Sequence, residues 1–452
     1  MRSFLLTFWL CGSAAGLFAQ VPAAPGSPLL RNWLHSVSRD SLAHSIDRLV
    51  SFGTRSSFST RQDPERGIGA AERWVYGCFQ RYSAAGGGRL QVRMERWTQA
   101  PEGTITRPLA MANVLALLPG SDPKDPRLLV VGAHLDSRCS DIQDSTHAAP
   151  GANDDGSGVA AVLELARVLS RERLHESILF CVFSGEEQGL FGSRQLARLA
   201  RDSSWQIRAM LNNDMIGQST ASGTGVRDNT HVRVFSEGIP VAETPSQARL
   251  RRILAADNDS PGRELARYVS QMALSYVPGL KVRLIYREDR FLRGGDQYSF
   301  SAEGFAAVRL SDAVENYTHQ HQDVRRVKGV LYGDLPRFMD FNYLTENTRL
   351  NLATLGSLAL APSRPRAVYL QLKGLDNFST LSWEPPRYGR AVAYRVYVRA
   401  SDSPDWQQAY ECRTTSLRLP FSKDNVYFAV QALGAGGTGS LMVFPSLAPK
   451  TP

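Results

Sequence analysis

Two continuously apolar runs near the middle of the chain constrain its fold most. Residues 128–133 and 177–184 are short and rich in β-branched and aromatic side chains, which is typical of strands buried on both faces. Between them, residues 156–170 repeat apolar side chains at helical spacing. A buried strand, a helix and a second buried strand predict a βαβ unit, and therefore a parallel sheet covered by helices.

Further segments extend this pattern on both sides. We predict helices at residues 41–53, 69–82, 190–200, 261–277 and 340–360, and strands at residues 90–97, 111–118, 207–211, 280–286 and 306–310. Residues 217–256 are irregular and rich in turn signals, so no element is predicted there. The expected fold class is α/β: a mixed, mostly parallel sheet with helices on both faces, spanning residues 40–362.

The composition changes at Pro362-Ser-Arg-Pro365. Beyond it, short alternating runs are separated by turn residues, which predicts a small all-β sandwich over residues 363–452. Its segments 381–385 and 427–432 resemble the tryptophan strand and the tyrosine-corner strand of a fibronectin type III module. Such a module suggests a protein partner or a surface to which the chain binds.

The N-terminus is typical of an exported protein. Arg2 precedes an apolar run at residues 4–10, and small residues then lead to Ala19. This pattern predicts a signal peptide at residues 1–19, cleaved after Ala19, and a secreted or periplasmic product. Residues 20–39 begin rich in proline and alanine and are expected to form a loose lead-in. No other apolar segment approaches the ~20 residues that span a bilayer, so no membrane span is expected.

Charge and cysteine content argue against two other classes of protein. The net charge is +9, but the arginines are scattered and form no basic stripe interleaved with aromatic residues, so we expect no nucleic-acid binding. Four cysteines follow the predicted signal peptide, widely spaced, at Cys78, Cys139, Cys181 and Cys412. A disulfide-stapled secreted scaffold would be much denser in cysteine.

Polar side chains of one chemical kind follow the ends of the predicted strands. Because open α/β sheets place their sites at the carboxyl ends of strands, these residues are expected to converge. Imidazole and carboxylate donors without thiolates suit zinc. The candidates are His134, Asp136, Asp154, Glu186, Glu187, Asp214 and His319.

Residues 40–360 resemble the secreted dizinc exopeptidases of metallopeptidase family twenty-eight, the bacterial leucyl-type aminopeptidases. The matching motifs are His134-Leu-Asp136-Ser, Gly151-Ala-Asn-Asp154-Asp155-Gly, Glu186-Glu187, Asn213-Asp214-Met and a histidine four residues before Asp323.

The resemblance implies a role for each residue. Asp154 would bridge two zinc ions, His134 and Asp214 would complete one site, and Glu187 and His319 the other. Asp136 would orient His134, and Glu186 would be the general base. His321 is the alternative to His319, Tyr317 is the nearest candidate for an oxyanion donor, and the Asp154–Asp155 peptide is expected to be cis.

The leading functional hypothesis is an aminopeptidase acting on peptides. A carboxypeptidase of the same fold and a glutaminyl-cyclase-like acyltransferase with one zinc are the alternative enzymes. A receptor or adhesion protein that has lost its ligands is a third class, which the complete set of candidate residues disfavours.

Overall fold

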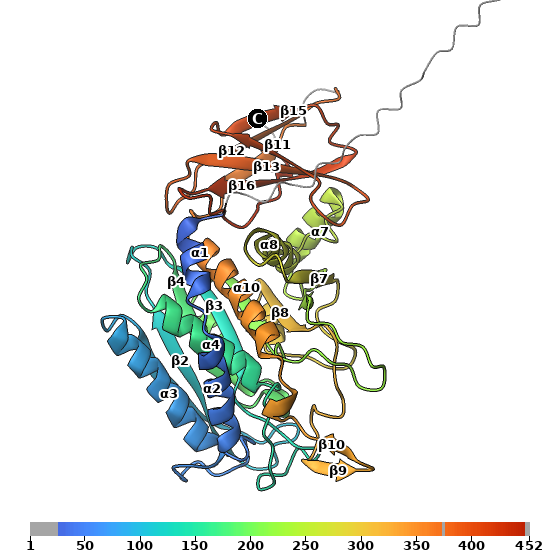
Figure 1. The fold of residues 1–452 in the computed structure, drawn as a ribbon. Coiled ribbons are helices and arrows are strands. Elements are labelled where there is room, and N and C mark those ends of the chain that lie inside the picture. The colour runs from blue at the N-terminus through green and yellow to red at the C-terminus, as the bar shows by residue number, and fades with distance from the viewer. Residues whose placement is uncertain (1–25, 373–375, 448–452) are drawn as a thin grey trace, which may run out of the picture.

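The computed structural model describes residues 26–372 and 376–447 (Figure 1). The predicted signal peptide lies outside the described residues. The helices are α1 Pro28–His35, α2 Arg39–Ser51, α3 Gly67–Ala85, α4 Gly156–Leu169, α5 Glu186–Gly189, α6 Phe191–Asp202, α7 Pro245–Leu254, α8 Pro261–Tyr276, α9 Gln297–Ala302 and α10 Phe341–Leu360, with a 3₁₀ turn η1 at Pro336–Phe338.

An eight-stranded sheet forms the centre of the larger domain. Its strands are β1 Gln91–Gln99, β2 Leu109–Leu118, β3 Arg127–His134, β4 Ser177–Phe183, β5 Gln206–Asn213, β6 His231–Phe235, β7 Lys281–Ile285 and β8 Ala307–Asp312. Their order is β1-β2-β4-β3-β5-β8-β6-β7. The central strands β4, β3, β5 and β8 run parallel, whereas β2 and β6 pair antiparallel with their central neighbours. The predicted mixed, mostly parallel sheet is confirmed.

Helices cover both faces of this sheet. Successive side chains of each buried strand point to opposite faces, so both faces present apolar side chains that must be covered. Leu129 and Val131 of β3 belong to the large core that includes α2, α3, α4, α8 and α10. Leu128 and Val130 of the same strand belong to a smaller core with residues of α6 and α9. Residues 128–133 of β3 and 178–183 of β4 are apolar throughout because neither face of these strands meets solvent.

Two segments differ from the sequence-based expectation. Part of the expected loose lead-in forms α1, whose Leu30 and Trp33 are buried. They approach Gly356 of α10 so closely that a Cβ there would lie 2.6 Å from the Leu30 side chain. The irregular stretch at residues 217–256 contains β6 and α7. The five-residue strand β6 and the helix α7, which buries none of its residues, are both weak in sequence pattern.

The C-terminal region forms the predicted small all-β sandwich. One sheet has the order β15-β12-β11-β17 and the other β14-β13-β16. Side chains of both sheets, among them Trp383 and Val396, share one core. Its strands are β11 Arg366–Leu370, β12 Ser379–Glu384, β13 Ala393–Ala400, β14 Gln408–Cys412, β15 Ser416–Leu419, β16 Val426–Leu433 and β17 Ser446–Leu447.

The sandwich packs on helix α8 and on the loop before it through buried polar contacts. The Tyr268 hydroxyl donates to the Gly439 carbonyl at 2.8 Å, and a guanidinium nitrogen of Arg399 lies 2.6 Å from Asp259 Oδ2. Figure 1 shows the sandwich at one end of the molecule and a hairpin, β9 Arg325–Val327 with β10 Val330–Tyr332, at the other. Among the described residues, no helix is both long and apolar enough to cross a membrane.

Candidate metal centre

Three neighbouring strands deliver the candidate residues to one edge of the sheet. His134 is the last residue of β3, Asp214 follows the end of β5, and Glu186 and Glu187 open α5 directly after β4. Asp154 lies in the loop before α4. The apolar runs therefore become polar where the parallel strands end, as expected of a site in this type of sheet.

A first group of donors surrounds His134. Nε2 of His134 lies 3.1 Å from Oδ1 of Asp154 and 3.9 Å from Oδ1 of Asp214. One ligand atom from each of these three buried residues lies within 4.8 Å of the others. This spacing fits a single cation between them.

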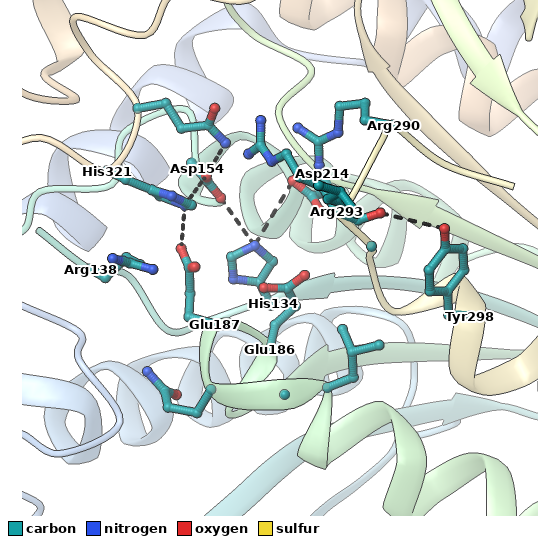
Figure 2. Close-up of a pocket in the computed structure, with 16 residues that line it drawn as sticks. His134, Arg138, Asp154, Glu186, Glu187, Asp214, Arg290, Arg293, Tyr298 and His321 are labelled. Atoms are coloured by element: carbon teal, nitrogen blue, oxygen red, sulfur yellow. Dashed lines mark hydrogen bonds and ion pairs between the residues drawn. The ribbon is translucent and has the colours of Figure 1, made fainter. Parts of the chain in front are cut away.

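A second group uses the other oxygen of Asp154. Nε2 of His321 lies 3.0 Å from Oδ2 of Asp154 and 2.9 Å from Oε1 of Glu187. These three residues form the second set whose ligand atoms lie within 4.8 Å of one another. Asp154 thus belongs to both groups, with one oxygen directed to each (Figure 2).

The position of the last histidine differs from the prediction. His319 does not join either group of donors; its Nδ1 lies 3.0 Å from Gln218 Oε1, and its ring stacks on Phe338 at a centroid distance of 3.8 Å. The alternative, His321, occupies the place expected of His319. The prediction of His319 rested on its spacing of four residues from Asp323. Both histidines lie in a loop, where no periodicity indicates which side chain faces the sheet edge.

Asp136, the residue predicted to orient His134, contacts that ring mainly through its backbone. His134 Nδ1 contacts the backbone carbonyl of Asp136 at 2.9 Å, while the nearest Asp136 carboxylate oxygen lies 3.9 Å away. That carboxylate accepts the backbone N–H groups of Gly185, Glu186 and Glu187 at 2.8, 3.2 and 3.1 Å. Its side chain therefore holds the turn that carries both glutamates, and its carbonyl makes the shorter contact with His134.

Residues that the sequence analysis missed hold the Asp154 loop. Asp334 Oδ2 accepts the backbone N–H groups of Asn153 and Asp154 at 2.9 and 2.7 Å. The fully buried Arg55 donates to the carbonyls of Pro150 and Gly151 at 2.6 and 2.9 Å. Neither residue lies beside a recognisable motif, so no local signal marks it.

Two further positioning residues did have a signal in the sequence. Asp155 Oδ1 caps α4 through the Gly158 N–H at 3.0 Å, and its Oδ2 accepts the His134 N–H at 3.1 Å. Arg309, a charged residue inside the apolar run of β8, lies 3.0 Å from Asp214 Oδ1. An aspartate before a helix start and an arginine inside a buried strand are patterns that call for partners.

Carboxylates dominate the electrostatics of the site. Burial alone lowers the pKa of His321, but Glu187 and Asp154 raise it to about 10. Burial also disfavours the charged form of His134, yet Glu186 and Asp154 raise its pKa well above the ordinary value. A field that stabilises protonated imidazoles equally favours a metal cation among the same donors. The residues present therefore fit a pair of cations bridged by Asp154.

Glu186 lines the same pocket as both donor groups without belonging to either. Figure 2 shows it next to His134, while Glu187 faces His321. Burial raises the pKa of Glu186 well above the ordinary value, and the carboxylate of Glu187 raises it further. Bound cations would lower this pKa again, towards the range in which a carboxylate exchanges protons near neutral pH.

Three further predictions concern a peptide bond, a tyrosine and the cysteines. The Asp154–Asp155 peptide bond is cis, as the resemblance implies. The side chain of Tyr317 is exposed and does not line the pocket over the donors, whereas Tyr298 does. All four cysteines in the described residues are free thiols, and none belongs to either donor group.

Known proteins are similar to this chain in sequence. Residues 113–328 match the model of peptidase family M28. A probable zinc metalloprotease of Pyrenophora tritici-repentis is 40% identical over 429 residues, covering 94% of this chain and 88% of the relative. Another, from Pyricularia oryzae, is 41% identical over 408 residues, covering 88% of this chain and 81% of the relative.

Solved structures show the same fold. The LapA aminopeptidase of Legionella pneumophila aligns with a TM-score of 0.51 at 18% identity, covering 74% of this chain and 75% of LapA. LapB of the same organism aligns with a TM-score of 0.53 at 18% identity, covering 75% and 78%. On its sequence relatives and the family match, the chain belongs to peptidase family M28, a family that includes zinc metalloproteases.

Proposed function

We propose that this chain is an exported, two-zinc exopeptidase, an aminopeptidase that removes N-terminal residues from peptides. The observation that carries the proposal is the shared carboxylate: Asp154 presents Oδ1 to His134 and Oδ2 to His321. A bridging carboxylate between two nitrogen- and oxygen-donor sets suits a pair of zinc ions. His134, Asp154 and Asp214 would hold one ion, and Asp154, Glu187 and His321 the other.

When bound, the two zinc ions supply Lewis-acid chemistry that acidifies water near neutral pH and polarises a peptide carbonyl. The residues of the chain do the rest. Glu186 lines the pocket over the donor groups, where it can accept a proton from the attacking water and pass it to the leaving amine nitrogen. Asp136 keeps Glu186 in place by accepting its backbone N–H.

Metal content and substrate panels test this proposal. The purified chain should bind about two zinc ions and hydrolyse aminoacyl anilides, and a chelator should abolish that activity. Peptides with a blocked N-terminus should be poor substrates. One tightly bound zinc ion together with cyclisation of N-terminal glutamine would favour the acyltransferase alternative, and a preference for N-blocked peptides would favour the carboxypeptidase.

Replacing Glu186 by glutamine tests the proton-transfer role. The variant Glu186→Gln should keep both zinc ions and lose about 10²–10⁴-fold in kcat, the usual contribution of a general base. Glu102, an exposed glutamate that pairs with Arg194, gives a matched control in Glu102→Gln. Full activity of Glu186→Gln would assign the proton transfer to another group.

Export and the role of the sandwich are part of the same proposal. The signal-like N-terminus supports secretion or periplasmic export, which mass spectrometry of the secreted chain would test by a mature N-terminus at Gln20. The sandwich, which resembles a fibronectin type III module, lies at the end of the molecule opposite the hairpin that follows His321 (Figure 1). This arrangement supports a role in binding a partner or surface while leaving the zinc site open.

A further inference from the structure

Arginines surround the pocket over the donor groups. The pocket has a volume of 710 Å³, and Arg138, Arg290 and Arg293 line it together with the metal-site residues (Figure 2). Within the described residues, its only carboxylates belong to the candidate centre itself: Asp154, Glu186, Glu187 and Asp214. Among the described residues, the charged side chains that line the pocket outside the candidate centre are therefore all arginines, which attract an anion and repel an ammonium.

Arg290 and Arg293 share one buried anchor. Nη1 of Arg290 and Nη1 of Arg293 donate to Oε2 of Glu315 at 3.1 and 2.9 Å. Burial alone would raise the pKa of Glu315, but the surrounding arginines lower it to about 2. Glu315 therefore stays ionised and holds both side chains in place. Within the described residues, no hydrogen bond engages Nη2 of either arginine.

In this cluster, the guanidinium groups outnumber the carboxylates that lie outside the donor groups. Four guanidinium groups gather here, and outside the donor groups they meet two carboxylates, Asp289 and Glu315. The guanidinium groups belong to Arg233, Arg290, Arg293 and Arg309. Asp214, the remaining partner of Arg309, belongs to the metal site. Positive charge is left over at the wall of the pocket, beside Asp214.

We infer that the pocket selects substrates with a carboxylate next to the scissile bond, bound by Arg293 and Arg290. The inference rests on the proposed peptidase function and adds the substrate class. Arginine suits this role because its planar donors match a carboxylate in a bidentate arrangement. The carboxylate has two possible sources: the side chain of an N-terminal aspartate or glutamate, or the free C-terminus of a short peptide.

Substrate pairs distinguish these two sources. Glutamyl and leucyl anilides differ in the side-chain carboxylate and carry no terminal carboxylate. A dipeptide and its C-terminal amide differ only at the terminus. In one of these pairs, the substrate with the additional carboxylate should have a kcat/KM about ten- to a hundredfold higher than its neutral counterpart. A difference of this size is the usual effect of a charge-assisted hydrogen bond.

Arg293 is the better residue to replace, because its side chain is 29% exposed and Arg290 is more enclosed. Arg293→Gln should lower kcat/KM for the preferred acidic substrate at least ten times more than for its neutral counterpart. Arg293→Lys should restore part of the difference. Arg283→Gln removes the same charge from an exposed position on β7, outside the pocket, and should leave both rates unchanged.

Chelator-sensitive hydrolysis separates this inference from the proposed function. If zinc-dependent hydrolysis occurs but acidic and neutral substrates react equally, the substrate class is wrong and the peptidase function stands. Equal loss on both substrates in Arg293→Gln would likewise overturn the inference. If no peptide is hydrolysed, the proposed function itself fails.

Discussion

Nε2 of His321 lies 3.0 Å from Oδ2 of Asp154, although a long stretch of chain separates the two residues. The contact joins the loop before α4 to the segment before the β9–β10 hairpin. His321 adopts a left-handed backbone conformation, with φ of 54°. Its ring faces the sheet edge, whereas His319, two residues earlier, stacks on Phe338.

This arrangement predicts different effects for the two histidines. His321→Ala should reduce bound zinc from two ions to about one per chain and remove most activity, because it deletes a donor of the second group. His319→Ala should keep both ions and lower only the stability, through the lost contact with Phe338. Elemental analysis together with thermal unfolding separates the two outcomes. If His319→Ala loses zinc and His321→Ala does not, His319 is the ligand, as predicted from the sequence.

Most of the fold follows from patterns in the sequence. Residues 128–133 in β3 and 178–183 in β4 are apolar at every position because both faces of the central sheet are covered, so the type and place of these strands are easy to predict. The strand β6 and the helix α7 have no such pattern. Their stability comes from neighbouring elements, as in the pairing of β6 with β8, and a single sequence does not reveal it.

The site was predictable where a residue ends a strand or precedes a helix. His134, Asp154 and Asp214 stand at such positions. Asp334 does not, and its importance arises from a tertiary contact with the backbone of Asp154. The same holds for His321, whose role is decided by the path of a loop.

The contacts of Asp136 predict a separation between zinc binding and turnover. In Asp136→Asn, an amide replaces a carboxylate that accepts three backbone N–H groups, so the Glu186–Glu187 turn should shift. The carbonyl that contacts His134 is unchanged. We expect kcat to fall by about 10²-fold, because displaced catalytic groups cost about that much, while zinc affinity stays within a fewfold of the native value.

Zinc titration with a competing chelator and single-turnover kinetics would measure both quantities. A residue that acts by orienting His134 through its side chain would instead lower metal affinity by about 10–100-fold. That outcome would contradict the role assigned here to the carboxylate.

Asp334 should matter for both stability and metal binding. Asp334→Ala leaves the backbone N–H groups of Asn153 and Asp154 without their acceptor in a buried site. Such a loss costs about 1–3 kcal/mol for each unsatisfied group. Denaturant unfolding should show this destabilisation, and zinc affinity should fall because Asp154 loses its support.

Asp323 provides the matched control, because its carboxylate also accepts a backbone N–H, that of Ser140 at 3.1 Å, but at an exposed position. Asp323→Ala should change the free energy of unfolding by less than about 1 kcal/mol, since water can replace the lost acceptor. Equal effects of the two substitutions would show that Asp334 has no special role in the loop.

A buried carboxyl group away from the metal centre predicts a dependence of stability on pH. Glu237, which follows β6, is buried, and burial raises its pKa to about 7. Its carboxylate accepts the backbone N–H of Val241 at 3.3 Å, which opposes the rise in pKa, and the nearby Glu288 contributes to the raised value. The folded chain therefore holds this proton at pH values at which the unfolded chain has released it.

The sign of the effect follows from proton linkage. Between the unfolded pKa near 4.5 and the folded pKa of about 7, the folded state binds more protons, so this group lowers the stability as pH rises. Glu237→Gln imitates the protonated form at every pH. Relative to the native chain, its melting temperature should be higher at pH 8 and nearly equal at pH 5. Calorimetry of both chains at the two pH values measures this difference, and a shift of the same size at both would mean that Glu237 does not titrate in this range.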